Sequence, residues 1–305
     1  MTNSLIVLIL TAISCSLLGV FLVLRNLSML TDAISHTVLL GIVLAFFIVK
    51  DLDSPVLIVG ASLMGLLTVY LIETIGSKGI SKYDDAIGMV FPVLFALAVI
   101  LISKFFRNVH LDLDVVLMGE VLFSSLVKTT VFGIEISKAV LHGLILLALI
   151  LVFIISQYKK LKISTFDKEF AYLIGIPTTA IFYLLMTLTS VAAVVSFDSV
   201  GAILVISFFI APSAAVLNFA KSLKQALIWT SLIATLNSIL GFYLAIHFNV
   251  SIAGAVATCN MVIYLAMLIL KKYTSNKVSY TDDDKDIDRN DQYESTEGRI
   301  LNHHI

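Results

Sequence analysis

The sequence predicts an all-α protein, a polytopic transmembrane bundle of about eight to nine helices, and three observations support this. Only 13% of its 305 residues are charged and 59% are hydrophobic, with a mean hydropathy of +1.03. A water-soluble domain has about 25% charged residues, so this chain lacks the polar groups to cover a soluble surface. Apolar runs of membrane-spanning length recur along the chain, and a polar, acidic tail follows them.

The first apolar run, 4–24, has no basic residue before Arg25 and stays apolar for about 20 residues, so it predicts a retained helix rather than a signal peptide. Further runs predict helices near 33–49, 55–75, 86–103, 134–156, 178–197, 199–219, 225–247 and 251–270. Residues 104–133 mix charges with apolar residues. A tenth span, a re-entrant half-helix and a surface helix all stay open for this segment.

Clusters of lysine predict which loops face the cytoplasm, because cytoplasmic loops carry an excess of Lys and Arg. They lie at Lys159, Lys160, Lys162 and Lys168, at Lys221 and Lys224, and at Lys271, Lys272 and Lys277. The side of the N-terminus stays open. Residues 1–273 are therefore expected to form the transmembrane domain, and residues 274–305 a disordered, acidic cytoplasmic tail.

Several motifs are absent, and their absence narrows the function. The sequence contains no GxxxxGK[ST] phosphate loop and no HExxH, GxSxG or CxxC motif. It has no basic stripe for nucleic acid, and Cys15 and Cys259 are interpreted as small buried residues. We expect no catalytic residues and no permanently bound cofactor. A conduit is favoured over an enzyme, and any ATPase that powers it is a separate chain.

Asp32 and His36 form an ionisable pair at the start of an apolar run, in "SMLTDAISHTVLLGIVLAFFIV" (28–49). Positions i and i+4 share one helix face, and ionisable residues within spans usually mark a transport path. A carboxylate and an imidazole suit Mn²⁺ or Zn²⁺, and two copies of the chain would supply four ligands. Alternatively, Thr31 or Asp32 caps the helix and His36 is an interhelical hydrogen-bonding residue. The pattern alone leaves both open.

Four stretches in order carry a family resemblance. They are "RNLSMLTDAISHTVLLGIVLAF" (25–46), "LMGEVLF" (117–123), "TFDKEFAYLIGIP" (165–177) and "VGAILVISFFIAPSAAVL" (200–217), and "GFYLAIHFNVSIAGAVA" (241–257) continues the agreement. Together they resemble the permease subunit of metal-ion ABC transporters, the manganese, zinc and iron-chelate uptake family. The resemblance covers about residues 5–273 and leaves out the tail.

This resemblance implies a type II ABC importer-like fold in the bacterial plasma membrane. It implies a homodimer in contact with membrane lipid, a separate cytoplasmic ABC ATPase subunit and an extracellular metal-binding lipoprotein. In this family the Asp and His of the "DAISH" segment are implicated in metal coordination, and they correspond to Asp32 and His36. The transported cation is expected to be Mn²⁺ or Zn²⁺.

The segment 165–177 follows the most basic loop and is expected to couple to the ATPase. A short surface helix ending at glycine and proline would fit a cleft in such a partner, with aromatic side chains as anchors. The alternative is an amphipathic turn lying on lipid headgroups. The coupling residues are Phe166, Asp167, Glu169, Phe170, Ala171 and Gly175.

Other polar residues within or near the apolar runs are weaker candidates. Glu120 and Asp198 are expected as secondary residues of the metal path, with Asp198 in a short outer turn that caps a helix from Ser199. Asn237 and Ser238 are expected to hydrogen-bond between helices.

Two rival functions remain at this point. An ATP-independent secondary transporter or channel would use Asp32 and His36 to relay ions. An intramembrane enzyme would use them as acid and base, but no second carboxylate stands in a convincing context.

Overall fold

The computed structural model describes residues 2–51, 54–77, 82–105, 121, 128–131 and 134–273. Within these ranges, eight helices are long and apolar enough to cross a membrane, which confirms the predicted fold class. They are α1 (Thr2–Leu24), α2 (Ser28–Val49), α3 (Val56–Ser77), α4 (Tyr83–Phe105), α7 (Lys138–Phe166), α9 (Thr178–Val200), α11 (Leu223–Phe248) and a last helix (Ile252–Tyr273). The tail 274–305 and most of the mixed segment 104–133 lie outside the described residues.

Two shorter helices and two strands complete the described elements. Helix α8 (Lys168–Leu173) and helix α10 (Ala202–Leu217) are too short to count as full spans. Strands β1 (Lys128–Val131) and β2 (Ile134–Ser137) pair antiparallel, with Lys128 opposite Ser137. Because this hairpin occupies Ile134–Ser137, the helix expected to start near 134 begins at Lys138 instead.

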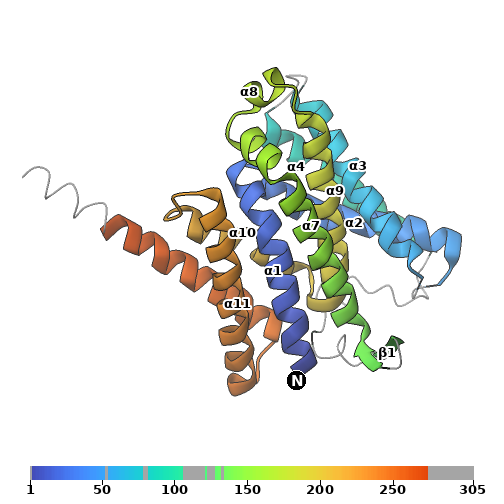
Figure 1. Ribbon diagram of the computed structural model, residues 1–305. Helices are drawn as coiled ribbons and strands as arrows, with labels where there is room; N and C mark the ends of the chain where they lie inside the picture. The colour runs from blue at the N-terminus through green and yellow to red at the C-terminus, as the bar shows by residue number, and fades with distance from the viewer. Residues whose placement is uncertain are drawn as a thin grey trace, which may run out of the picture.

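Helix α1 lies at the centre of the bundle, between α7 and α10, with α11 also packed against it (Figure 1). In its most apolar 18-residue stretch, 78% of the residues are buried. Gly19 allows the close approach of α10, because a Cβ there would collide with the carbonyl of Phe209. One turn away, the Ser213 hydroxyl donates to the Ser16 carbonyl at 3.1 Å. Close backbone approach and side-chain hydrogen bonds therefore join these two helices.

Helices α2, α3 and α4 form a second group on the other side of the bundle (Figure 1). Gly41 on α2 packs directly on the backbone of Gly60 and Ala61 on α3. The Thr68 hydroxyl donates to that of Thr37 at 2.8 Å across the same contact. Since α3 turns back against both α2 and α4, these two helices run in the same direction.

Arg25 anchors the C-terminal end of α1. Its guanidinium donates to the Ser164 hydroxyl at 2.9 Å and to the Thr165 hydroxyl at 3.1 Å, both at the end of α7. Burial lowers the pKa of this guanidinium, although arginine remains protonated in proteins. The end of α1 therefore lies beside the lysine-rich end of α7.

The same contact extends the orientation expected from the lysine clusters to the N-terminus. If the lysine-rich end of α7 is cytoplasmic, then Thr2, at the opposite end of α1, lies on the outer side. Figure 1 shows this arrangement, with the N-terminus at the end away from α8. Helix α4 ends and α7 begins at that same end.

Candidate functional site

Asp32 and His36 lie in the second and third turns of α2, close to its inner end. The Asp32 Oδ1 and His36 Nε2 atoms are 3.5 Å apart, and the two side chains are 42% and 34% exposed. Within the described ranges, no group of three or more His, Cys, Asp or Glu residues gathers to hold a metal. One copy of the chain thus offers two such ligands at this position.

The structure rules out the capping alternative for Asp32. Helix α2 begins at Ser28, and its N-cap residue is Leu27, which makes no side-chain capping hydrogen bond. The helix therefore starts about one turn earlier than the hydropathy profile predicts, and Asp32 lies within it. The Thr31 and Ser35 hydroxyls bond to carbonyls of their own helix instead.

Two aromatic rings on α4 hold the imidazole of His36. Phe91 stacks on it, with ring centroids 5.6 Å apart and planes 27° apart. Phe95 meets it edge to face at 5.5 Å and 72°. These rings restrict the orientation of the imidazole while Nε2 faces Asp32. Sequence reasoning missed both residues, because phenylalanines four apart in an apolar helix are ordinary core residues.

Of the two secondary candidates, the structure describes only Asp198, which does not join this pair. Glu120 lies outside the described residues. Asp198 is exposed in the last turn of α9, at the outer end of the bundle, whereas Asp32 lies near the inner end. The expected outer turn at Asp198 is wrong, because α9 continues to Val200 and Gly201, with φ 84°, is the only residue between α9 and α10.

Helix α8 projects at the inner end of the bundle (Figure 1). Asp167 is its N-cap, and its carboxylate accepts a hydrogen bond from the Phe170 backbone N–H at 2.8 Å. Ala171 is fully buried, whereas Phe166 and Phe170 are 62% and 50% exposed, and Glu169 is also exposed.

The segment after α8 turns sharply into α9. Gly175 follows at φ +77°, a backbone conformation that glycine adopts without strain. The Ile176 N–H donates back to the Ala171 carbonyl at 2.9 Å, which ends α8 firmly. The predicted short surface helix, ended by glycine, is thus present.

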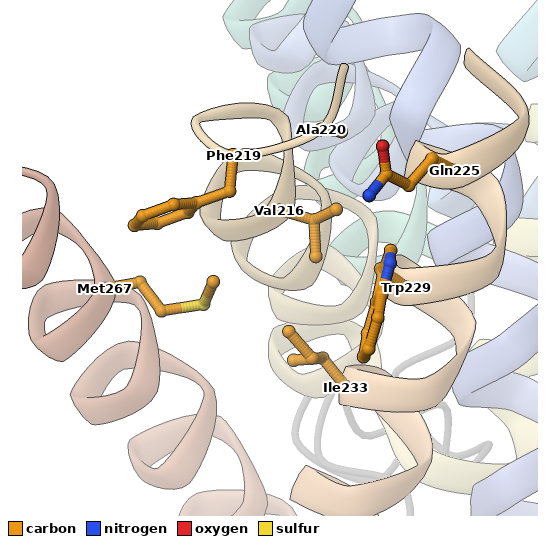
Figure 2. Close-up of a pocket in the computed structure, with 7 residues that line it drawn as sticks. All are labelled: Val216, Phe219, Ala220, Gln225, Trp229, Ile233 and Met267. Atoms are coloured by element: carbon orange, nitrogen blue, oxygen red, sulfur yellow. The ribbon is translucent and has the colours of Figure 1, made fainter. Parts of the chain in front are cut away.

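A groove of about 250 Å³ lies between α10, α11 and the last helix (Figure 2). Its lining is apolar apart from the Gln225 amide and the Trp229 indole N–H. The complete lining is Val216, Phe219, Ala220, Gln225, Trp229, Ile233 and Met267. Since it offers no carboxylate, imidazole or thiol, this groove is unsuited to a divalent transition metal.

A polar network joins the last helix to the bundle. The Asn237 amide donates to the Asn260 side-chain oxygen at 2.7 Å, and the Asn260 amide donates to the Ser207 hydroxyl at 3.0 Å. The interhelical role expected of Asn237 is therefore present. Ser238 instead bonds within α11, to the Ala234 carbonyl.

Comparison with known families decides the family of this bundle. Residues 1–271 match the model described as the ABC 3 transport family.

The chain belongs to the ABC 3 transport family.

Relatives in this family share much of the sequence. The chain is 44% identical over 262 residues to the manganese transport system membrane protein MntD of Bacillus subtilis, covering 86% of this chain and 88% of that one. It is 42% identical over 257 residues to the zinc transport system membrane protein TroD of Treponema pallidum, covering 84% and 70%. This member of the ABC 3 transport family is thus a multi-pass bacterial membrane protein.

Solved structures agree with the fold. A chain of PsaBC from Streptococcus pneumoniae, in complex with a Fab, superposes with a TM-score of 0.75 at 30% identity, covering 90% of this chain and 94% of that one. A metal-chelate type ABC transporter in an inward-facing conformation has a TM-score of 0.62 at 15% identity and supports the fold alone.

Proposed function

We propose that the chain is the membrane-spanning permease subunit of an ATP-driven importer of Mn²⁺ or Zn²⁺. The observation that carries this proposal is the Asp32–His36 pair, partly exposed on a membrane helix of a family whose named relatives transport manganese or zinc. A carboxylate costs about 2.5–3.5 kcal/mol at the centre of a membrane helix and less toward its ends, and ionisable residues within such helices usually serve a function.

The path requires a second copy of the chain. A divalent transition metal takes four to six ligands, and Asp32 and His36 supply two. A homodimer that brings two such pairs together supplies four and covers side chains that otherwise face the membrane. A cation delivered from an extracellular metal-binding lipoprotein would lose its water on this set, passing Asp198 and Glu120 as secondary residues of the path.

The driving force is assigned to a separate ABC ATPase docked on α8. The exposed rings of Phe166 and Phe170 offer apolar anchors, and Asp167, Glu169, Ala171 and Gly175 shape the segment. Closure of the ATPases on ATP would move α8 and open the helices alternately outward and inward.

The experiment is cation uptake into vesicles that contain the permease together with its ATPase. Asp32→Ala and His36→Ala should each lower Mn²⁺ and Zn²⁺ uptake at least about tenfold, since each removes a metal ligand. His247→Ala is the matched control: it removes an exposed histidine in the last turn of α11, which lies at the outer end of the bundle, and uptake should stay unchanged.

Two results would contradict the proposal. Unchanged uptake in both the Asp32 and the His36 variants would remove the coordinating role. Uptake at the same rate by vesicles that hold the permease alone, without ATPase or ATP, would indicate a secondary transporter or channel instead.

A further inference from the structure

A proline within α4 frees one backbone carbonyl. Pro92 lies inside the helix Tyr83–Phe105. Proline has no N–H, so the carbonyl four residues earlier, that of Gly88, loses its helical hydrogen-bond donor. Within a membrane such a carbonyl needs another partner, because lipid provides none.

The freed carbonyl lies level with the Asp32–His36 pair. Helices α2 and α4 run in the same direction, with His36 against Phe91 and Phe95 and Phe47 against Phe105. These contacts give the alignment of the two helices: subtracting 55 to 59 from the number of an α4 residue gives the α2 residue at the same height. Helical carbonyls point toward the C-terminal end, so the Gly88 oxygen lies between the levels of Gly88 and Pro92. That interval corresponds to 29–37 on α2, which is centred on the pair.

Gly88 also lies on the correct face of α4. Positions 88, 91 and 95 are spaced i, i+3 and i+7, which places them on one side of a helix. Phe91 and Phe95 on that side contact His36. The backbone of Gly88 therefore faces the same space as the imidazole.

Packing gives no reason for a glycine at this position. A Cβ at Gly19, Gly41, Gly60 or Gly65 would collide with a neighbouring atom, whereas a Cβ at Gly88 would meet nothing within 4 Å. Gly88 is exposed, and so is Pro92. No side chain of Gly88 stands between this part of the backbone and the open space.

We propose that the Gly88 carbonyl oxygen is a third metal ligand of each protomer, beside Asp32 and His36. This inference rests on the proposed function. Two protomers would then offer two carboxylates, two imidazoles and two carbonyls, a six-donor set rich in oxygen. Carbonyl oxygen suits Mn²⁺ better than the softer Zn²⁺, which takes four ligands readily. The freed carbonyl thus favours manganese.

The test is Pro92→Ala, which restores the N–H at 92 and pairs the Gly88 carbonyl within the helix. The affinity of the purified permease–ATPase complex for Mn²⁺ and for Zn²⁺ would be measured by calorimetry. Mn²⁺ affinity should fall about tenfold, with a smaller loss for Zn²⁺. Pro212→Ala is the matched control, since it makes the same chemical change inside α10 and should leave both affinities unchanged.

A second measurement detects the carbonyl ligand directly. In protein labelled with ¹³C at the glycine carbonyls, electron–nuclear double resonance of bound Mn²⁺ should show a ¹³C coupling from a directly ligating carbonyl, and Pro92→Ala should remove it.

The outcomes separate this inference from the proposed function. If Asp32→Ala and His36→Ala abolish Mn²⁺ binding while Pro92→Ala leaves it intact and no ¹³C coupling appears, the carbonyl ligand is wrong and the proposed function stands. If Mn²⁺ binding survives in the Asp32 and His36 variants, the proposed function itself fails. Equal losses for both metals, in Pro92→Ala and Pro212→Ala alike, would indicate a change of helix shape and overturn the carbonyl ligand.

Discussion

The centre of the bundle around α1 and the face between α2 and α4 differ in how far their polar groups are buried. On α1, the Ser16 carbonyl accepts a hydrogen bond from the Ser213 hydroxyl of α10, and 78% of the apolar stretch is buried. In α4 only 22% of the corresponding stretch is buried, and the neighbouring Asp32 and His36 keep over a third of their side-chain surface exposed. The first region holds the fold together. The second leaves an acidic and an imidazole side chain partly exposed on one helix face.

The largest expected effect is a loss of stability in the packed region around α1. Gly19→Val would drive a side chain into the Phe209 carbonyl, and because that group is backbone of α10, it has little room to move. We expect a destabilisation of about 3 kcal/mol, measured as a lower unfolding temperature in detergent and a lower yield of folded protein. Gly254→Ala, where a Cβ meets only an ordinary contact at 3.9 Å, should be neutral or slightly stabilising; similar unfolding temperatures for both variants would contradict the packed description of α1.

The next effect changes the open face without disturbing the fold. Replacing Phe91 and Phe95 together by leucine removes both rings from His36 while keeping apolar bulk. Uptake should fall about tenfold, since the imidazole is no longer oriented, and unfolding should change by less than about 1.5 kcal/mol for each replacement.

Phe47→Leu is the control for this pair of replacements. It makes the same substitution on α2, where the ring meets Phe105 instead of His36, and uptake should be unaffected. Equal uptake in the Phe91/Phe95 variant and the Phe47 variant would show that the rings serve only packing.

The smallest effect concerns α8. This helix lies in the chain between α7, which packs on α1, and α9, which packs on α3, so it connects the two regions. Asp167→Ala removes the N-cap of α8 at a cost of about 1 kcal/mol, whereas Asp167→Asn keeps a capping oxygen. Metal-stimulated ATP hydrolysis by the complex should fall several-fold in the alanine variant, in line with that energy, and stay near normal in the asparagine variant. Equal rates in both variants would contradict a role for the shape of α8 in coupling.

The sequence predicts the spans well, because length and hydropathy are enough to identify a helix surrounded by lipid. It places the start of α2 too late, because Leu27 is an apolar cap that gives no signal in the sequence. It also misplaces Asp198, since the conformation of Gly201, and no polar signal, decides where α9 ends.

The sequence predicts only part of the candidate site. The spacing of Asp32 and His36 leaves ligand and cap open, the resemblance to a family favours the ligand, and the structure excludes the cap because α2 begins at Ser28. Phe91, Phe95 and Gly88 escaped notice, because their meaning depends on how α4 is aligned with α2, and a helix pattern does not encode the alignment of its neighbour. The role of Asp32 and His36 in transport remains a prediction.

Arg25 connects the end of α7 to the start of α2 over a short stretch of chain. Its guanidinium donates hydrogen bonds to the last turn of α7, immediately before α8. Only Asn26 and Leu27 separate Arg25 from α2. Asp32 follows just seven residues after Arg25. If α8 is the docking segment proposed above, a displacement of α8 would reach Asp32 and His36 through Arg25 and the seven residues of chain that follow it.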